Sequence, residues 1–314
     1  MFDIQRIAYA AWTEIAQPAD SDAAALIGVV GAEKALAIVE NNAALCTAEH
    51  EAFVTSPHRT GKTLDELLAG WRGAYSGRSQ AQANIEMMAR LGGGLLTPED
   101  EHWPMAAKDQ ATTAVALWWR GNLENGLPEL HNSMAIVGSR DATEYGRQIT
   151  AEIASAAVRS GVTVFSGGSY GIDAAAHTAA LAEETQLMPT VALQAGGLDR
   201  LYPAGNDDLL RRVTERGLLL SAVAPGAAPT RSRFLNRNRL MASMVGATIV
   251  TEARWRSGAL TTARDTFEDG RKVGAVPGSV FSANSAGTHR LIRDGFATLV
   301  TDGAEALQLL PLKP

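Results

Sequence analysis

The chain has 314 residues, of which 46% are hydrophobic and 20% are charged, and its formal net charge is −6. This balance is that of a globular protein with material for one large α/β domain and a smaller one. Its single cysteine, Cys46, excludes an intramolecular disulfide. No apolar stretch of membrane-spanning length and no amino-terminal signal pattern occur, so we expect a cytoplasmic protein without a membrane segment.

Residues 1–95 are predicted to form a small helical domain. Apolar positions recur three and four residues apart, as around Leu26 and Leu36, and no strand-like alternation interrupts them. Thr63 is the expected N-cap of a helix that contains three nearby leucines. The glycine-rich segment 92–98 is typical of a linker. A short connecting segment around Trp118 follows it.

From Ser133 onward the sequence alternates between short apolar runs and helix-length amphipathic stretches. The runs lie at Met134–Val137, Val162–Phe165, Thr190–Leu193, Leu218–Leu220, Ala247–Val250, Val273–Val276 and Ala297–Val300. Helices are expected between them, for example at Tyr145–Ser160, Asp173–Glu183 and Asp207–Arg216. This order predicts right-handed crossovers and a Rossmann-like, doubly wound, mostly parallel sheet over residues 96–314. Ligands of such sheets bind outside the carboxyl ends of the strands.

The loops after the first two runs contain the residues of an anion site. Gly138, Ser139 and Arg140 combine exposed backbone N–H groups with a planar guanidinium donor. The loop that follows the second run has three glycines, which let a phosphate approach the backbone closely, and Asp173 is positioned to cap the next helix. Its candidate contacts are Ser166, Gly167, Gly168 and Gly171. Each loop alone is equally compatible with an ordinary strand-to-helix turn.

The segment between Pro225 and Leu240 is strongly basic, although the negative net charge is unlike that of most nucleic-acid-binding proteins. It contains no acidic residue and four arginines: Arg231, Arg233, Arg237 and Arg239. It is either a solvated segment, a helix start whose arginines pair with acids, or a phosphate site in which Asn236 and Asn238 add donors. The ring of Phe234 is available for base stacking or for packing in the core.

A further loop, after the run that ends near Glu252, places small and hydroxyl residues at the start of a helix. Its candidate anion contacts are Ser257, Gly258 and Thr261. Because all these loops follow strands of one parallel sheet, we expect them to converge on a single groove.

Catalytic and metal sites are not indicated. Ser56–Thr63 ends like a P-loop, but its first glycine is replaced by Ser56 and no strand ending in aspartate lies nearby, so helix capping by Thr63 explains it. Ser166, Asp173 and His177 lack a nucleophile elbow, and we expect His177 to bond locally. The histidines and the cysteine have no metal-ligand spacing. We therefore expect no catalytic residue, metal or cofactor.

The order of the sequence blocks resembles the DNA-processing protein A (DprA/Smf) family over residues 99–303. The blocks are GSR (138–140), SGGSYGIDAAAH (166–177), GLDRLYP (197–203), NRNR (236–239), EARWRSGALTTA (252–263), GRKVGAVPG (270–278) and GTHRLIRDG (287–295). The resemblance implies an extended Rossmann fold, single-stranded DNA binding, a homodimer, and loading of RecA recombinase onto incoming DNA during natural transformation. The apolar run 306–312 would contribute to the dimer.

This chain departs from the family pattern at several positions. They are Gly168-Ser169, Ala195, Ala222 and Leu235. The N-terminal helices resemble the family's helix-hairpin-helix-like domain only loosely, and we expect no C-terminal winged-helix domain.

Two other functions remain open from the sequence. The fold is related to phosphoribohydrolases of the lysine-decarboxylase-like (LOG) type, which act on nucleoside monophosphates and carry a P-G-G-x-G-T-x-x-E block. Here Pro277-Gly278-Ser279 lacks the second glycine and the Thr and Glu that follow it. Release of a free base from a nucleoside monophosphate would identify such an enzyme. The acidic net charge also leaves open a scaffold that has lost DNA binding.

Overall fold

The computed structural model describes residues 3–104 and 114–313. The N-terminal helices are α1 (Ile4–Ile15), α2 (Ser21–Val39), α3 (Thr47–Thr55), α4 (Leu64–Ala74) and α5 (Arg78–Arg90). The later helices are α7 (Glu144–Arg159), α8 (Ile172–Ala182), α9 (Asp207–Arg216), α10 (Arg231–Ser243), α11 (Ala259–Glu268), α12 (Ala286–Arg293) and α13 (Gly303–Leu307). In the described part of the chain, no helix combines the length and the apolar character needed to cross a membrane.

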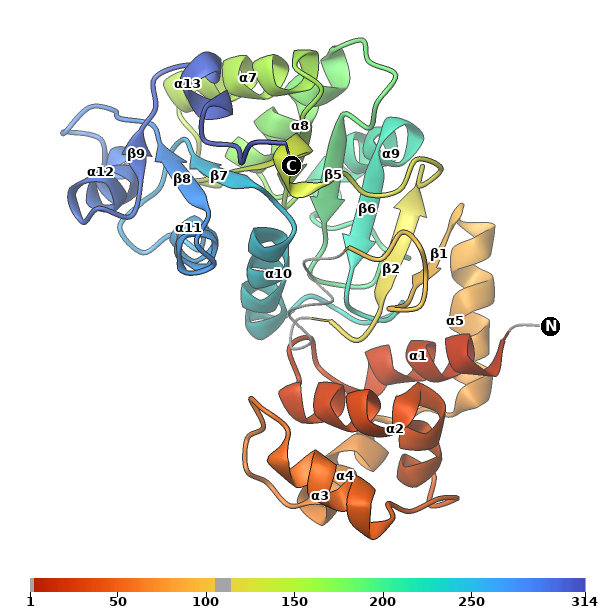
Figure 1. Cartoon of the computed structure of the whole chain (residues 1–314). Coiled ribbons are helices and arrows are strands. Elements are labelled where there is room, and N and C mark those ends of the chain that lie inside the picture. The colour runs from red at the N-terminus through yellow and green to blue at the C-terminus, as the bar shows by residue number, and fades with distance from the viewer. Residues whose placement is uncertain (1–2, 105–113, 314) are drawn as a thin grey trace. The chain divides into compact units, whose positions relative to one another are not determined.

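The strands form a mostly parallel sheet, as predicted (Figure 1). They are β1 (Gly93–Leu96), β2 (Leu117–Gly121), β3 (Ser133–Val137), β4 (Thr163–Ser166), β5 (Thr190–Leu193), β6 (Leu218–Ser221), β7 (Ala247–Val250), β8 (Lys272–Ala275) and β9 (Thr298–Leu299). The strand order is β1-β2-β6-β5-β4-β3-β7-β8-β9. Strands β3 to β9 lie within one residue or two of the predicted runs. The interpretation of 92–98 as a linker is wrong, because Gly93–Leu96 pairs as β1.

Strand β3 is the centre of the parallel part of the sheet, and successive strands are added first on one side of it and then on the other. From β3 the chain proceeds through β4 and β5 to β6, and it then returns to add β7, β8 and β9 on the other side of β3. Because the crossovers of parallel strands are right-handed, the reversal places α7–α9 on one face and α11 and α12 on the other. The point between the carboxyl ends of β3 and β7 is therefore the topological switch point, where such sheets bind ligands.

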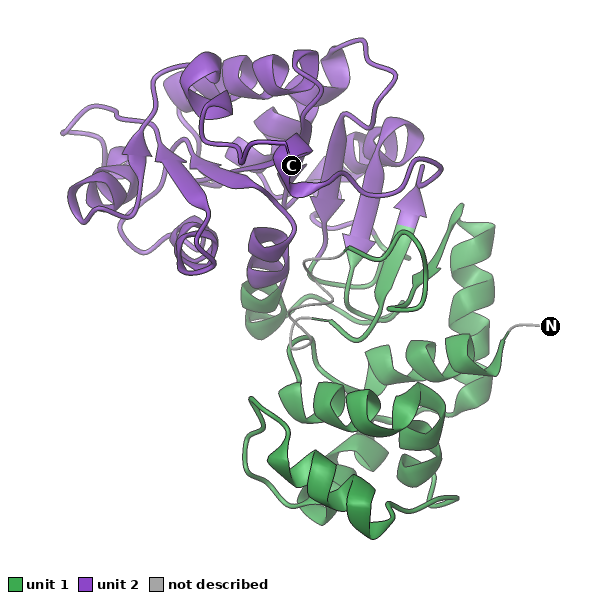
Figure 2. Ribbon diagram, in the orientation of Figure 1, with its two compact units in different colours: residues 1–119, 195–200, 221–236 green, residues 120–194, 201–220, 237–314 purple. Residues whose placement is uncertain are grey.

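Two compact units divide the chain (Figure 2). Unit 1 comprises residues 1–119, 195–200 and 221–236, and unit 2 comprises 120–194, 201–220 and 237–314. This division differs from the boundary at residue 95 expected from the sequence, since β1, most of β2 and two later segments belong to unit 1.

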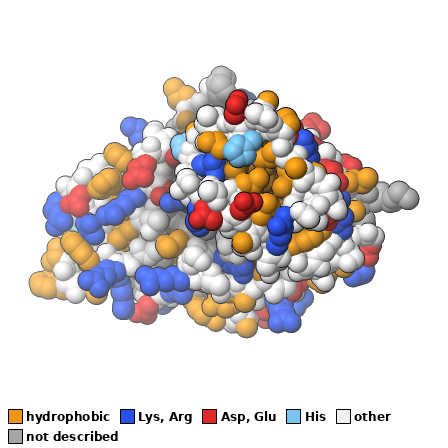
Figure 3. All heavy atoms as spheres, turned by 90° about the horizontal axis from the view of Figure 1, so that it is seen from below, with side chains coloured by type: hydrophobic (Ala, Val, Ile, Leu, Met, Phe, Trp, Pro, Cys, Tyr) orange, Lys and Arg blue, Asp and Glu red, His pale blue; other side chains and the backbone are white. Residues whose placement is uncertain are grey.

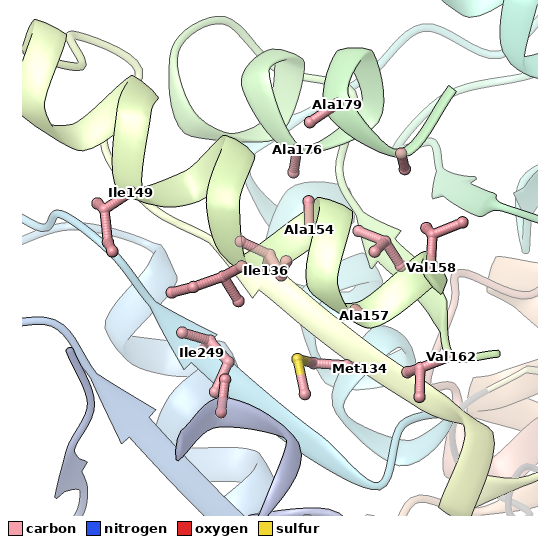
Figure 4. Packing of buried hydrophobic residues seen from close by; sticks show 14 of the residues in the cluster. Met134, Ile136, Ile149, Ala154, Ala157, Val158, Val162, Ala176, Ala179 and Ile249 are labelled. Carbon is pink, nitrogen blue, oxygen red and sulfur yellow. The ribbon is translucent and has the colours of Figure 1, made fainter. Parts of the chain in front are cut away.

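The core of unit 2 lies between the central strands and the helices of one face. Met134 and Ile136 of β3, and Ile249 of β7, are fully buried against α7 (Figure 4). Ala154 and Ala157 let α7 approach the sheet closely. This packing fixes β3 and β7, and with them the loops that leave their carboxyl ends.

In unit 1, the segment Ser56–Thr63, which ends like a P-loop, has a structural role. Thr63 caps α4 in a capping box with Glu66, as predicted. The carboxylate of Asp22, which is 1% exposed, accepts hydrogen bonds from Arg59 Nε at 3.0 Å and from Thr60 Oγ1 at 2.5 Å. The segment is thus tied to α2 by a buried ion pair.

Candidate nucleic-acid interface

The switch point brings together the loops that follow β3, β4, β7 and β8. Val137 pairs in register with Val250, and Val250 pairs with Ala275, so the three strands end at one level. The N–H group of Ser139 donates to the carbonyl of Glu252 at 2.7 Å, which joins the loop after β3 to the loop after β7. We call residues 138–141 the arginine loop and residues 166–171 the glycine loop.

The glycine loop is held by its carbonyl groups. The side-chain amide of Asn206 donates to the carbonyl oxygens of Gly168 (2.9 Å) and Ser169 (3.0 Å). Among the residues that the structure describes, none accepts a hydrogen bond from the backbone N–H groups of Tyr170 or Gly171. The loop therefore presents amide donors, as an anion site requires.

Helix α8 begins directly after the glycine loop without a side-chain cap. Its N-cap residue is Gly171, and Asp173 does not cap it as predicted. The Asp173 carboxylate instead accepts from the Ser169 N–H group at 3.2 Å, within the loop that precedes the helix. The N–H group of Ile172 donates to the carbonyl of Ser139, and the other donors of the first turn, with the positive end of the helix dipole, are left for a ligand.

Gly171 has to be glycine because the arginine loop crosses its backbone. Its φ is 75°, and a Cβ atom there would lie 2.2 Å from the carbonyl oxygen of Ser139. The N–H group of Ile172 donates to the same oxygen at 3.1 Å. The two loops are thus fixed against each other, and exposed Arg140 lies beside the start of α8.

Ser139 and Ser166 are buried and bonded within the protein. The hydroxyl of Ser166 donates to the carbonyl of Ile136 at 2.7 Å. The hydroxyl of Ser139 accepts from the N–H group of Asp141 and contacts its carbonyl, both at 3.2 Å. These two side chains shape the loops and present no hydroxyl to a ligand in this conformation.

Arg237 lies beneath the glycine loop rather than at the surface. Its side chain is buried, and Nη1 donates to the carbonyl of Leu193 at 3.0 Å. A Cβ atom at Gly167 would lie 1.7 Å from this nitrogen. Burial lowers the pKa of Arg237, the carboxylate of Asp173 opposes this shift, and Arg140 adds to it. The guanidinium therefore places positive charge directly under the loop.

His177 has a structural role, as predicted. It is fully buried, and its Nδ1 contacts the hydroxyl of Thr190 at 2.7 Å. That hydroxyl donates to the carbonyl of Val164, so Nδ1 carries the proton. Burial, together with the charge of Arg237, lowers the pKa of His177 to about 3, which keeps the ring neutral.

The loops after β7 and β8 interlock with the arginine loop. Arg254 forms an ion pair with Asp141 at 2.5 Å and donates from Nε to Asn284 at 3.0 Å. The side-chain amide of Asn284 donates to the carbonyl of Asp141 at 2.5 Å. Of the predicted contacts here, Ser257 and Thr261 are partly exposed and Gly258 is exposed. The Ser257 hydroxyl accepts from the Ala259 N–H group at 3.3 Å.

Helix α10 begins at Arg231 after Thr230, whose hydroxyl accepts from the N–H group of Arg233 at 3.3 Å. Arg231 and Arg239 are exposed, whereas Asn238 is buried and donates to the carbonyl of Gly258 at 3.2 Å. The exposed apolar residue of this helix is Leu235 (45%), and Phe234 is partly buried.

Within unit 1, two predicted DNA contacts are bonded to the protein itself. Arg233 donates from Nε to Gln17 at 3.1 Å and from Nη1 to the carbonyl of Ala228 at 2.6 Å, and burial lowers its pKa. Asn236 donates to the carbonyl of Pro18 at 2.5 Å. These bonds tie the first turns of α10 to the connection between α1 and α2.

The structure adds residues that the sequence reasoning missed. Tyr170, Trp255 and Phe281 are exposed aromatic side chains in the loops after β4, β7 and β8. They stand singly in the sequence, without a periodic pattern, and only their position after a strand could have indicated them. A shallow groove of about 680 Å³, lined by Arg140, Gly171 and residues of α7 and α8, lies beside the arginine loop.

Comparisons with known proteins identify the family of the chain. Residues 94–311 match the family described as DNA recombination-mediator protein A. The chain is 38% identical over 323 aligned residues to a Mycobacterium tuberculosis protein that bears the DprA name, with 99% of this chain and 76% of that protein covered.

Two solved structures share the fold. The DNA processing protein A of Streptococcus pneumoniae aligns with a TM-score of 0.75 and 25% identity, over 99% of both chains. The Helicobacter pylori protein, whose structure was described with its single-stranded DNA binding mode, aligns with a TM-score of 0.59 and 26% identity, over 68% of this chain and 94% of that one. The match of sequence blocks, strand-end loops and fold leads to one conclusion: the chain belongs to the DNA recombination-mediator protein A (DprA/Smf) family.

Proposed function

We propose that this chain binds single-stranded DNA at the carboxyl ends of β3, β4 and β7 and acts as a recombination mediator without catalytic chemistry of its own. The observation that carries the proposal is the junction of the two loops. Exposed Arg140, the N–H groups of Tyr170 and Gly171 and the start of α8, which has no side-chain cap, all belong to this junction, and buried Arg237 lies beneath it.

The chemistry of this junction suits a phosphodiester. Amide donors and a helix N-terminus bind anions without requiring a particular base, and a planar guanidinium adds a charged fork. Buried Arg237 acts through its field rather than by contact, because few water molecules screen it. Arg231 and Arg239 are the exposed arginines of α10 that would contact further phosphates, and Phe234 is the proposed stacking ring.

The place of this binding in the cell rests on the family. We propose that the protein is cytoplasmic, protects incoming strands and loads RecA recombinase onto them during natural transformation. A homodimer to which the C-terminal run 306–312 contributes is part of this proposal. In that run Ala306 is fully buried and Leu307, Leu309 and Leu310 are partly buried against the core of unit 2, whereas Leu312 is 93% exposed. Sedimentation at micromolar concentration should give a dimer, and a monomer throughout would remove this part of the proposal.

A mobility or anisotropy titration with labelled oligo-dT and with duplex, over a series of salt concentrations, tests the binding. Arg140→Ala should weaken single-strand binding and lower the magnitude of the slope of log K against log salt by about 0.7, as for one lost phosphate contact. Arg159→Ala is the matched control. Arg159 is an exposed arginine at the end of α7, where the chain returns to the amino end of β4. Equal affinity and slope for wild type and Arg140→Ala would remove Arg140 from the site.

A further inference from the structure

A second group of basic and aromatic side chains lies at the carboxyl ends of β7 and β8, outside the proposed phosphate site. Figure 3 shows basic side chains, with hydrophobic ones between them, over the part of unit 2 that carries α11 and α12, at the left of the view. Its exposed members are Arg254, Trp255, Arg256, Val280 and Phe281.

The indole ring of Trp255 is half exposed yet held in place. The guanidinium carbon of Arg290 lies 4.7 Å from the centre of the ring, and the side chain remains 49% exposed. A cation against an indole ring fixes its plane and enriches the site in positive charge. The neighbouring Arg256 is exposed and makes no hydrogen bond or ion pair with the described residues of the chain.

Phe281 stands at the tip of a tight turn. The N–H group of Ser282 donates to the carbonyl of Ser279 at 3.0 Å, which leaves Val280 and Phe281 at the two central positions. Their side chains are 79% and 96% exposed. Almost the whole apolar surface of this ring is therefore available for burial against a partner.

This group is continuous with the proposed phosphate site. Arg254 pairs with Asp141, the residue after Arg140, and Trp255 follows Arg254 in the chain. Asn284 bonds both Arg254 and the arginine loop, and Phe281 precedes it by three residues. A DNA strand with one phosphate at Arg140 would therefore reach these rings by continuing across the carboxyl ends of β3, β7 and β8.

We propose that Trp255 and Phe281 form a second stacking position for the bases of single-stranded DNA, with Arg256 on the adjoining phosphate. The proposal rests on the proposed function and extends it from one phosphate site to a path across β3, β7 and β8. Exposed rings with neighbouring arginines, as in Arg254-Trp255-Arg256, suit a single strand, since every base has a face that stacks and every nucleotide brings a phosphate. Paired bases in a duplex offer no such face.

The test compares the double variant Trp255→Ala/Phe281→Ala with wild type on two lengths of oligo-dT, about 6 and about 30 nucleotides. The longer strand should bind the variant about 5- to 30-fold more weakly, which is the effect of one or two lost stacks of about 1 kcal/mol each, with an unchanged salt slope. The shorter strand, which the phosphate site alone can hold, should bind both proteins equally. The variant Trp255→Phe/Phe281→Tyr should restore binding of the longer strand.

Leu187→Ala is the matched control, because Leu187 is 55% exposed and precedes the amino end of β5, whereas the proposed stacking rings follow the carboxyl ends of β7 and β8. It should bind both lengths as wild type does. An oligo-dT with one 5-iodouracil should also crosslink to Trp255 or Phe281 on irradiation, and the crosslinked peptide identifies the ring by mass spectrometry.

The outcomes separate the two proposals. If wild type binds neither length, the proposed function itself fails. If wild type binds, and the double variant binds the longer strand equally well without any crosslink at either ring, the second stacking position is overturned. If the double variant keeps its affinity for DNA but changes its sedimentation, the rings form a contact between protein chains, which also overturns the proposal.

Discussion

Replacement of buried Arg237 by methionine separates a structural arginine from one that contacts DNA. Methionine keeps most of the volume but removes the charged donor to the carbonyl of Leu193 and the positive charge near Asp173, which is 6% exposed. A hydrogen bond from a charged group contributes about 1.5–3 kcal/mol, and relief of the burial of the guanidinium offsets part of its loss. We expect a net loss near 2 kcal/mol, or a fall in Tm of about 3 °C for a protein of this size.

The same variant should keep the salt dependence of DNA binding. Since Arg237 releases no counterion from a phosphate, the slope of log K against log salt should stay at the wild-type value while the affinity falls modestly. Arg140→Ala should give the reverse pattern, with an unchanged Tm and a smaller slope. Differential scanning fluorimetry and anisotropy on the same preparations measure both quantities. A lower slope with an unchanged Tm in Arg237→Met would refute the assignment of Arg237 to the interior.

Three other substitutions test individual features. Gly171→Ala should abolish binding, because its Cβ would meet the carbonyl of Ser139 at 2.2 Å and force the loops apart; wild-type affinity in a titration would contradict this. Phe234→Ala should lose about 1–3 kcal/mol of binding with little salt dependence if a base stacks on the ring. If it instead lowers Tm while Phe234→Leu binds normally, the ring is an anchor of α10. His177 has a pKa of about 3 in the folded state, so only the unfolded chain takes up its proton between about pH 6.5 and 3, and stability should fall as pH falls, by about 1.4 kcal/mol per unit. His177→Asn should flatten that dependence in urea unfolding at pH 7 and pH 4.5, and equal slopes would show that another group titrates.

The fold was predictable because buried parallel strands are short continuous apolar runs. Thr190–Leu193 and Ala247–Val250 form strands with the predicted bounds, and Asp207–Arg216 forms the predicted helix. Strand β1 was missed because its glycines are typical of a linker and it has only four residues, so its pairing rather than its composition makes it a strand.

The site was predictable as a set of loops but not residue by residue. Ser166, Arg237 and Asn238 have side chains suited to phosphate, yet each is buried and bonded to a carbonyl of the protein. Which donors face water depends on the packing of distant segments, and a sequence pattern carries no such information. Conversely, Trp255 and Phe281 would be buried by default on hydrophobicity alone, and only the turns that carry them make them exposed.

The bonds of Asn284 and Arg254 to Asp141 make three loops one rigid body. Each loop alone would have to lose conformational freedom when a ligand arrives, and that entropy would be subtracted from the affinity. Here these bonds already order the loops in the folded protein, so in the proposed complex most of the ordering on association falls on the nucleic acid.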